Sequence, residues 1–300
     1  LGAQFRYLLG EPEETFGVAT GEMNAEILPH DRATGEDRYA LAWKHTQQFA
    51  PWLGGFFNIN KVSDDKYFAD FADRDAGLVA TSGPWSLLAR AQSFQTLQDP
   101  NAPVVPPYNR LPQILGSLSD TDWLGLTWSG NGEYARFTQD QLAPTGERFV
   151  LYPTAAFSRQ GSYWFFTARA GVHMREYSLD RTTAALPDSH PGYVIPITSL
   201  DAGLVFERDL QLRDTPLTQT LEPRAFYVYI PYKNQTNAPV FDTALDDFNF
   251  SQLFAENRYI GNDRIGDANQ LTLALTSRFL DRDTGAERLR LAVGQRFYFQ

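Results

Sequence analysis

Acidic pairs and histidines are the residues of this sequence that could support catalysis or bind a metal. Asp64 with Asp65, and Asp246 with Asp247, offer paired carboxylates for acid–base chemistry. Adjacent residues of a strand point to opposite faces, however, and acidic pairs in loops are usually solvated. Residues 242–249 do not form an EF-hand, because both its glycine and its terminal glutamate are missing. The histidines lack the spacing of metal ligands; they are His30, His45, His173 and His190. We therefore expect no enzymatic activity, no cofactor and no metal site.

The composition excludes several further classes of function. With 26 basic and 36 acidic residues the net charge is −10, which argues against nucleic acid as a partner. The chain has no cysteine, hence no internal disulfide framework. No apolar run is long enough for a transmembrane helix, but short alternating membrane strands escape such a search. Leu1 is not an initiator methionine and no signal segment follows, so we expect a piece of a longer protein. The aromatic share of 14% is high beside a mean hydropathy of −0.37.

A period of two dominates the sequence and predicts an all-β protein. In residues 161–180, Trp164 and Val172 share an apolar face, whereas Arg169, His173 and Arg175 share the opposite, polar face. Residues 287–300 repeat the pattern, with leucines on one face and three arginines on the other. Those arginines are Arg288, Arg290 and Arg296. We predict about fourteen antiparallel, up-and-down strands in one domain, residues 1–300.

Short turns and long polar connections alternate along the chain. Turns are expected at residues 48–52, 83–84, 119–122, 158–161, 213–216 and 282–285. Long loops are expected at residues 61–75, 98–109, 139–147, 179–192 and 231–267. In an antiparallel meander successive connections fall at opposite ends, so one end carries tight turns and the other large loops. That asymmetry is typical of outer-membrane barrels.

Strand length, polar inner faces and terminal aromatics also favour a membrane barrel over a soluble sandwich. Rings at strand ends suit the membrane interface; they are Phe56, Phe57, Tyr163, Trp164, Phe226, Tyr227, Tyr229, Tyr232, Phe297, Tyr298 and Phe299. Pro112, Pro153 and Pro196 are expected early in their strands, where each removes a ladder hydrogen bond and either marks the strand start or locally weakens the wall. The loop 231–267 holds too many apolar residues for disorder, so we expect it to fold on itself or tuck into the barrel mouth.

Several segments, in order along the chain, resemble the LPS-assembly protein LptD family, also called the organic solvent tolerance family. The most specific are TQTLEPRAFYVYIPYKNQ (218–235), FDTALDDFNFSQLF (241–254) and NRYIGNDRIGDANQLTLALTSR (257–278). Others are EILPHDR (26–32), NINKVSDDKYFADF (58–71), SLLARAQSFQTLQDP (86–100), PPYNRLPQ (106–113) and DAGLVFERD (201–209).

The resemblance implies part of a barrel of about twenty-six strands in the outer membrane of a Gram-negative bacterium. The family's N-terminal jellyroll and both gate strands would lie outside this chain. Lipopolysaccharide (LPS) would be the cargo, with a lipoprotein plug of the LptE type, a periplasmic Lpt bridge and the barrel assembly machinery as partners. The loop 231–267 would be an extracellular plug. Its candidate residues are Tyr232, Phe241, Asp242, Asp246, Phe248, Phe250, Phe254, Arg258, Asp263 and Arg264.

The basic residues on the polar faces are candidates for the lumen, where they would meet anionic sugar groups or partner carboxylates. They are Arg169, His173, Arg175, Arg288, Arg290 and Arg296. Three alternatives remain open at this point: a porin-like channel, a soluble all-β carbohydrate-binding protein and a glycosidase. A glycosidase needs two facing carboxylates, of which the pattern gives no sign.

Overall fold

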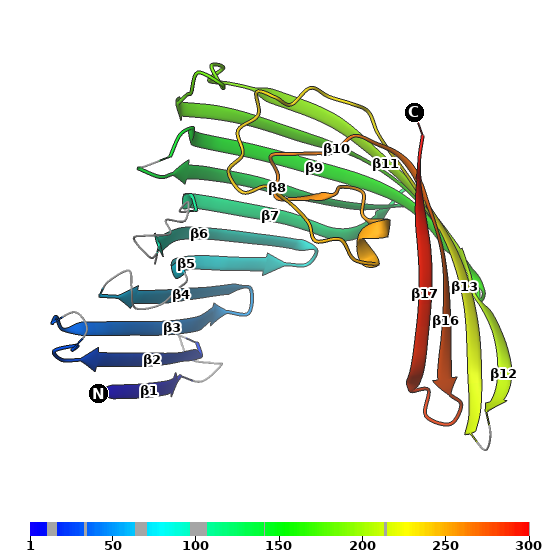
Figure 1. Ribbon diagram of the computed structural model, residues 1–300, viewed down its shortest axis with the longest axis horizontal. Coiled ribbons are helices and arrows are strands. Elements are labelled where there is room, and N and C mark those ends of the chain that lie inside the picture. The colour runs from blue at the N-terminus through cyan, green and yellow to red at the C-terminus, as the bar shows by residue number, and fades with distance from the viewer. Residues whose placement is uncertain are drawn as a thin grey trace. The chain divides into compact units, whose positions relative to one another are not determined.

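The computed structural model describes residues 1–10, 17–32, 35–63, 71–96, 107–140, 142–212 and 215–299, drawn as ribbons in Figure 1. The first strands are β1 (Gly2–Leu9), β2 (Ala19–Leu28), β3 (Arg38–Ala50), β4 (Leu53–Val62), β5 (Phe71–Ser82), β6 (Trp85–Thr96) and β7 (Asn109–Trp123). Next come β8 (Leu126–Thr138), β9 (Thr145–Gln160), β10 (Trp164–Arg181), β11 (Gly192–Leu204), β12 (Phe206–Leu212) and β13 (Thr215–Ile230). The last elements are β14 (Ala244–Leu245), the 3₁₀ helix η1 (Ser251–Phe254), β15 (Tyr259–Ile260), β16 (Ala268–Asp281) and β17 (Glu287–Tyr298).

Fifteen of the described strands pair in one antiparallel sheet, which confirms the all-β prediction. The order follows the chain from β1 to β11 and then runs β13, β16, β17. Only Val205 separates β11 from β12, and both strands pair with β13, one after the other along its length. They therefore act as one interrupted strand, which gives the fourteen up-and-down positions that the sequence predicts. No helix among the described residues has the length and hydrophobicity needed to cross a membrane.

Contacts within the chain group its residues into two compact units. The first comprises Leu1–Ser119, Asn131–Val150 and Arg175–Gly192, and the second comprises the remaining stretches, Asp120–Gly130, Leu151–Met174 and Tyr193–Gln300. The division falls within strands rather than in a linker. For this reason no shift in composition marks it in the sequence.

The first unit contains β1 to β6, most of β7 and parts of β8, β9 and β10. The predicted turn at Gly83 and Pro84 is confirmed, since Ser82 pairs with Trp85 across it. Its core includes a buried ion pair, in which Arg148 donates to Glu133 at 2.8 Å with both side chains almost fully buried.

Several details differ from the prediction. The expected turn at residues 119–122 is strand β7, and the chain turns instead at Leu124 and Gly125, both with positive φ. The expected loop 61–75 ends earlier, because β5 begins at Phe71; the acidic pair Asp64 and Asp65 lies outside the described residues. Pro153 stands near the middle of β9 rather than at its start.

Candidate functional site

The strands of the second unit have two chemically different faces. We call inward the face on which the loop 231–267 packs, and outward the opposite face. On β10, Gly171 and His173 are buried on the inward face, whereas Val172 is exposed on the outward face. Large apolar side chains that are exposed on the outward face are Leu151, Phe157, Trp164, Val172, Val194, Leu200, Leu204, Phe206, Leu221, Tyr229, Leu273, Leu275, Leu289, Leu291, Val293, Phe297 and Phe299. An apolar surface of this extent is typical of a membrane or protein contact.

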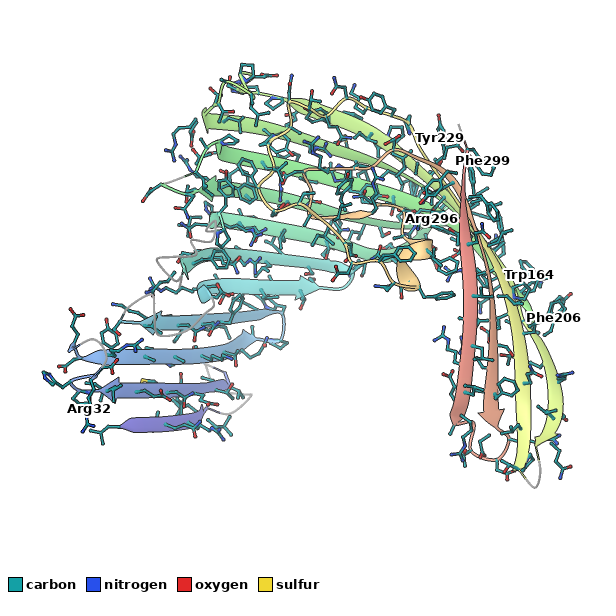
Figure 2. The ribbon with its side chains drawn as sticks, viewed as in Figure 1. Arg32, Trp164, Phe206, Tyr229, Arg296 and Phe299 are labelled. Atoms are coloured by element: carbon teal, nitrogen blue, oxygen red, sulfur yellow. The ribbon has the colours of Figure 1, made fainter. Side chains whose placement is uncertain are left out.

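Outward aromatic rings of this unit lie at two levels along the strands (Figure 2). Tyr229 and Phe299 lie together near the loop end, and Trp164 and Phe206 lie together farther down. Phe206 pairs with Leu221, eight residues before Tyr229 on β13. At about 3.3 Å per residue the levels are about 26 Å apart along the strand. For a strand tilted by about 40° this is about 20 Å across a membrane, close to the apolar band of about 25 Å between aromatic girdles.

The loop 231–267 is a folded element that joins β13 to β16, as predicted. Its two short strands β14 and β15 pair with each other. The fully buried carboxylate of Asp263 accepts hydrogen bonds from the backbone N–H groups of Phe241, at 2.8 Å, and Asp242, at 3.1 Å. The Asn257 side chain donates to the carbonyls of Tyr259 and Arg264. Side chains, in place of regular secondary structure, therefore form hydrogen bonds with backbone N–H and C=O groups of the loop.

An apolar patch on the inward face anchors the loop. The loop residue Ile265 is 5% exposed and packs into a cluster of wall side chains. The wall members of this cluster are Ile195, Ile197, Phe226, Val228 and Ile230. Phe226, one of the rings predicted at the membrane interface, lies on the inward face beneath the loop, with its ring 6.1 Å from that of Phe254.

Polar contacts hold the loop at several further points. Glu256 accepts hydrogen bonds from the hydroxyls of Tyr152, at 3.0 Å, and Ser199, at 2.6 Å. The buried Thr272 hydroxyl donates to the carbonyl of Leu253 at 2.7 Å. Arg296 of β17 donates to the carbonyl of Gln252, and Figure 2 shows this arginine beside η1. The loop is thus tied to strands β9, β11, β16 and β17.

Phe254 is the centre of an aromatic and cationic cluster. The guanidinium of Arg224 lies 3.9 Å from the centre of the Phe254 ring, a cation–π contact. Arg224 also binds Asp201 through two hydrogen bonds of 2.8 and 2.6 Å. Asp201 therefore neutralises the Arg224 guanidinium on one side, and the flat face of the guanidinium covers the Phe254 ring. This pairing fixes η1 without an uncompensated charge.

A cavity of about 630 Å³ remains between the loop and the inward face. Its wall residues include Thr167, Arg169 and Asp201, and its loop residues include Glu256 and Asn257. Most of these side chains are polar, and the volume is within the range of small-molecule sites.

The structure separates the six predicted basic residues into groups. His173 and Arg175 are almost fully buried. Arg288 pairs with Asp281 at 2.7 Å, and Arg296 is bound to the loop. Arg290 is exposed and stands opposite Arg278 in the strand register, and Arg169 is exposed and lines the cavity. Their assignment to a lumen stays a prediction.

The ten predicted loop residues differ in burial. Phe241 and Asp263 are buried, which suits their role in the loop's internal packing. The partly exposed members are Asp242, Phe250, Phe254 and Arg264. The exposed members are Tyr232, Asp246, Phe248 and Arg258. Their extracellular position also stays a prediction.

The described residues first considered for catalysis or metal binding belong to no metal-binding cluster. Within the described ranges, no three His, Asp or Glu side chains gather closely enough to hold a metal. His45 lies 2.6 Å from the Tyr7 hydroxyl and stacks on Phe57. Asp246 and Asp247 are exposed in the loop.

The apolar inward patch is the feature that sequence reasoning missed. Alternation predicts a polar inner face, yet Ile195 and Ile197 are buried there. The available signal was the run YVIPI at residues 193–197, which is apolar at both parities. A strand that is apolar on both faces is covered on both.

The sheet is antiparallel and up-and-down, and in the second unit it has an apolar outward face, two aromatic levels and a folded loop on its inward face. This combination is typical of the wall of an outer-membrane barrel. A family model described as LptD, LPS transport system D, matches residues 36–300. The chain belongs to the LptD family.

Relatives named LPS-assembly protein LptD are similar over the whole chain. The protein of Azoarcus sp. (strain BH72) is 45% identical over 317 residues, which is 100% of this chain and 38% of that protein. Those of Aromatoleum aromaticum and Burkholderia thailandensis are 44% and 41% identical over 100% and 99% of this chain, again 38% of each relative. The chain thus spans 38% of the length of these relatives.

Proposed function

We propose that this chain is part of an outer-membrane barrel that places LPS in the outer leaflet of a Gram-negative bacterium. The observation that carries the proposal is membership of the LptD family over residues 36–300. In this proposal residues 1–300 are a partial barrel domain of about twenty-six strands in all, without the jellyroll and the gate strands. The outward leucines and aromatic rings of the second unit support a wall that faces hydrocarbon.

The inward face and its loop have a separate role in the proposal. The loop 231–267 is an extracellular plug, supported by the anchoring of Ile265 and Glu256 to the wall. The polar inward side chains hydrate the path of the sugar portion of LPS. Candidate partners are a lipoprotein plug of the LptE type, the periplasmic Lpt bridge and the barrel assembly machinery. Transport changes no covalent bond, so the proposal assigns no catalytic residue.

The alternative functions receive less support. In a soluble carbohydrate-binding protein, outward rows such as Leu289, Leu291 and Val293 would be covered by a second layer, but they are exposed. A porin-like channel would share the wall but would conduct ions through an open lumen. No described feature favours it over the family's transport role.

Complementation tests the proposed function. A Gram-negative strain depleted of its own LptD protein would express the full-length protein that contains this chain, and LPS on intact cells would be measured by antibody labelling. We expect labelling and growth to recover. A protein that reaches the outer membrane in folded form but leaves surface LPS at the depleted level would refute the proposal. Ion conductance of the purified protein in planar bilayers, without LPS delivery, would favour a channel instead.

A further inference from the structure

We propose that the cavity beneath the loop 231–267 binds an acidic sugar unit, with the Arg169 guanidinium as its anion-binding group. The proposal rests on the proposed function, because the ligand would be a phosphorylated or carboxylated sugar of the LPS oligosaccharide. It assigns one place on the inward face where this part of the cargo is held during passage.

Arg169 differs from most arginines of the second unit in its availability. Arg224 is bound to Asp201, and Arg278 lies 3.1 Å from Glu222. Arg169 is exposed, lines the cavity and makes no hydrogen bond or ion pair to any residue in the described part of the chain. All five of its N–H donors are free for a ligand. A planar guanidinium matches the geometry of phosphate and carboxylate groups, to which it donates two parallel hydrogen bonds.

The rest of the cavity suits the hydroxyl groups of a sugar. Each oxygen of Glu256 accepts one hydrogen bond from the wall, so lone pairs remain for ligand hydroxyls. Thr167 and Asn257 add neutral donors and acceptors from the wall and the loop. Phe254, which is partly exposed, adds apolar surface for the C–H face of a ring. A volume of about 630 Å³ leaves room for one or two sugar units.

The charges of the lining favour an anion beside Arg169 rather than a cation. The Asp201 carboxylate is neutralised by Arg224, so it offers little attraction to a cation. Glu256 is engaged by two hydroxyl donors from the wall. Arg169 is thus a cation of the cavity with no carboxylate bound to it among the described residues, and an anionic ligand would supply the missing countercharge.

Binding measurements on the full-length protein, purified with its partner lipoprotein, test the site. The probes are the oligosaccharide released from LPS by mild acid, the same oligosaccharide after removal of its phosphates, and neutral maltohexaose. Calorimetry should show binding of the untreated oligosaccharide and a loss of affinity of about tenfold or more in Arg169→Ala. Arg169→Lys should retain part of the affinity, because the charge remains. Loss of binding after phosphate removal identifies phosphate as the anion, and retained binding that still depends on Arg169 identifies carboxylate.

The matched control is Arg290→Ala, since Arg290 is also exposed, inward and without a partner among the described residues, but does not line the cavity. It should bind like the wild type. The site would be overturned if both variants lost affinity equally or if Arg169→Ala bound with unchanged affinity. It would also be overturned if maltohexaose bound tightly or if the wild type bound no oligosaccharide. Folding of each variant is checked by its migration on unheated gels. If the wild type delivers LPS in the complementation assay while Arg169→Ala binds normally, only the site is refuted and the proposed function stands.

Discussion

Removal of the Glu256 carboxylate should loosen the loop 231–267 from the wall. Glu256→Ala deletes the acceptor of two hydrogen bonds, from Tyr152 at 3.0 Å and from Ser199 at 2.6 Å. Hydrogen bonds to a charged group contribute about 1.5–3 kcal/mol each when the partners are well shielded. Glu256 borders the cavity, where water replaces lost partners, so we take about 1.5 kcal/mol for both bonds together. The equilibrium constant for opening of the loop should then rise about tenfold.

Thiol labelling of a residue beneath the loop measures this opening. Residues 1–300 contain no cysteine, so Val228→Cys introduces a single thiol into them. The peptide that carries the label is then readily identified. Val228 is fully buried in the cluster that contains the loop residue Ile265. When opening is fast compared with labelling, the rate is proportional to the opening constant. We expect the rate in Val228→Cys to rise about tenfold when Glu256→Ala is added.

Single and control variants make the test specific. Tyr152→Phe and Ser199→Ala should each give a smaller rise than Glu256→Ala, because each removes one donor. Glu222→Ala removes an inward carboxylate that pairs with Arg278, so it should leave the labelling rate unchanged. An unchanged rate in Glu256→Ala, or an equal rise in Glu222→Ala, would refute the idea that this carboxylate fastens the loop.

Three further predictions concern the wall. Leu291→Arg should lower the unfolding free energy in bilayers by about 2–4 kcal/mol if the outward face meets lipid, and a change within about 0.5 kcal/mol in urea titrations would contradict that. Glu133→Ala should lower the unfolding free energy by about 3–5 kcal/mol because it removes one partner of the buried ion pair with Arg148, and thermal unfolding in detergent would measure the loss. Gly294→Leu should displace η1, since even a Cβ there would lie 2.8 Å from Leu253, and faster thiol labelling beneath the loop would report it; a normal rate would count against that packing.

Local patterns predicted the strands well. Alternation along residues 161–180 identified β10 and both of its faces, because the pleat alone decides which side chains share a face. The loop 231–267 was bounded correctly between Ile230 and Ala268. Its apolar content predicted a folded state. The turn after β7 was missed, because Leu124 has a positive φ, which its residue type does not indicate.

Contacts between distant segments could not be read from the sequence. Ile265 packs on Ile195 and Val228, and nothing local to any of the three residues indicates that pairing. Phe226 was assigned to the membrane interface because it was expected among aromatic residues at a strand end, yet it is covered on the inward face by Phe254, twenty-eight residues later in the chain. Sequence periodicity assigns a side chain to one of two faces, and tertiary contacts decide what covers that face.

Tertiary contacts also decide which basic residues are available to bind a ligand. A sequence shows where a guanidinium is, but its availability depends on carboxylates and carbonyls brought from other strands. Arg288 is matched by Asp281, and Arg296 is used by the loop. Arg169 and Arg290 retain exposed guanidinium groups without a partner among the described residues, and of these two only Arg169 borders the cavity. If cargo sugars are held on this inward face, the charge that holds them must be one that the wall has not already neutralised, and Arg169 meets that condition beside hydroxyl-binding groups of the loop.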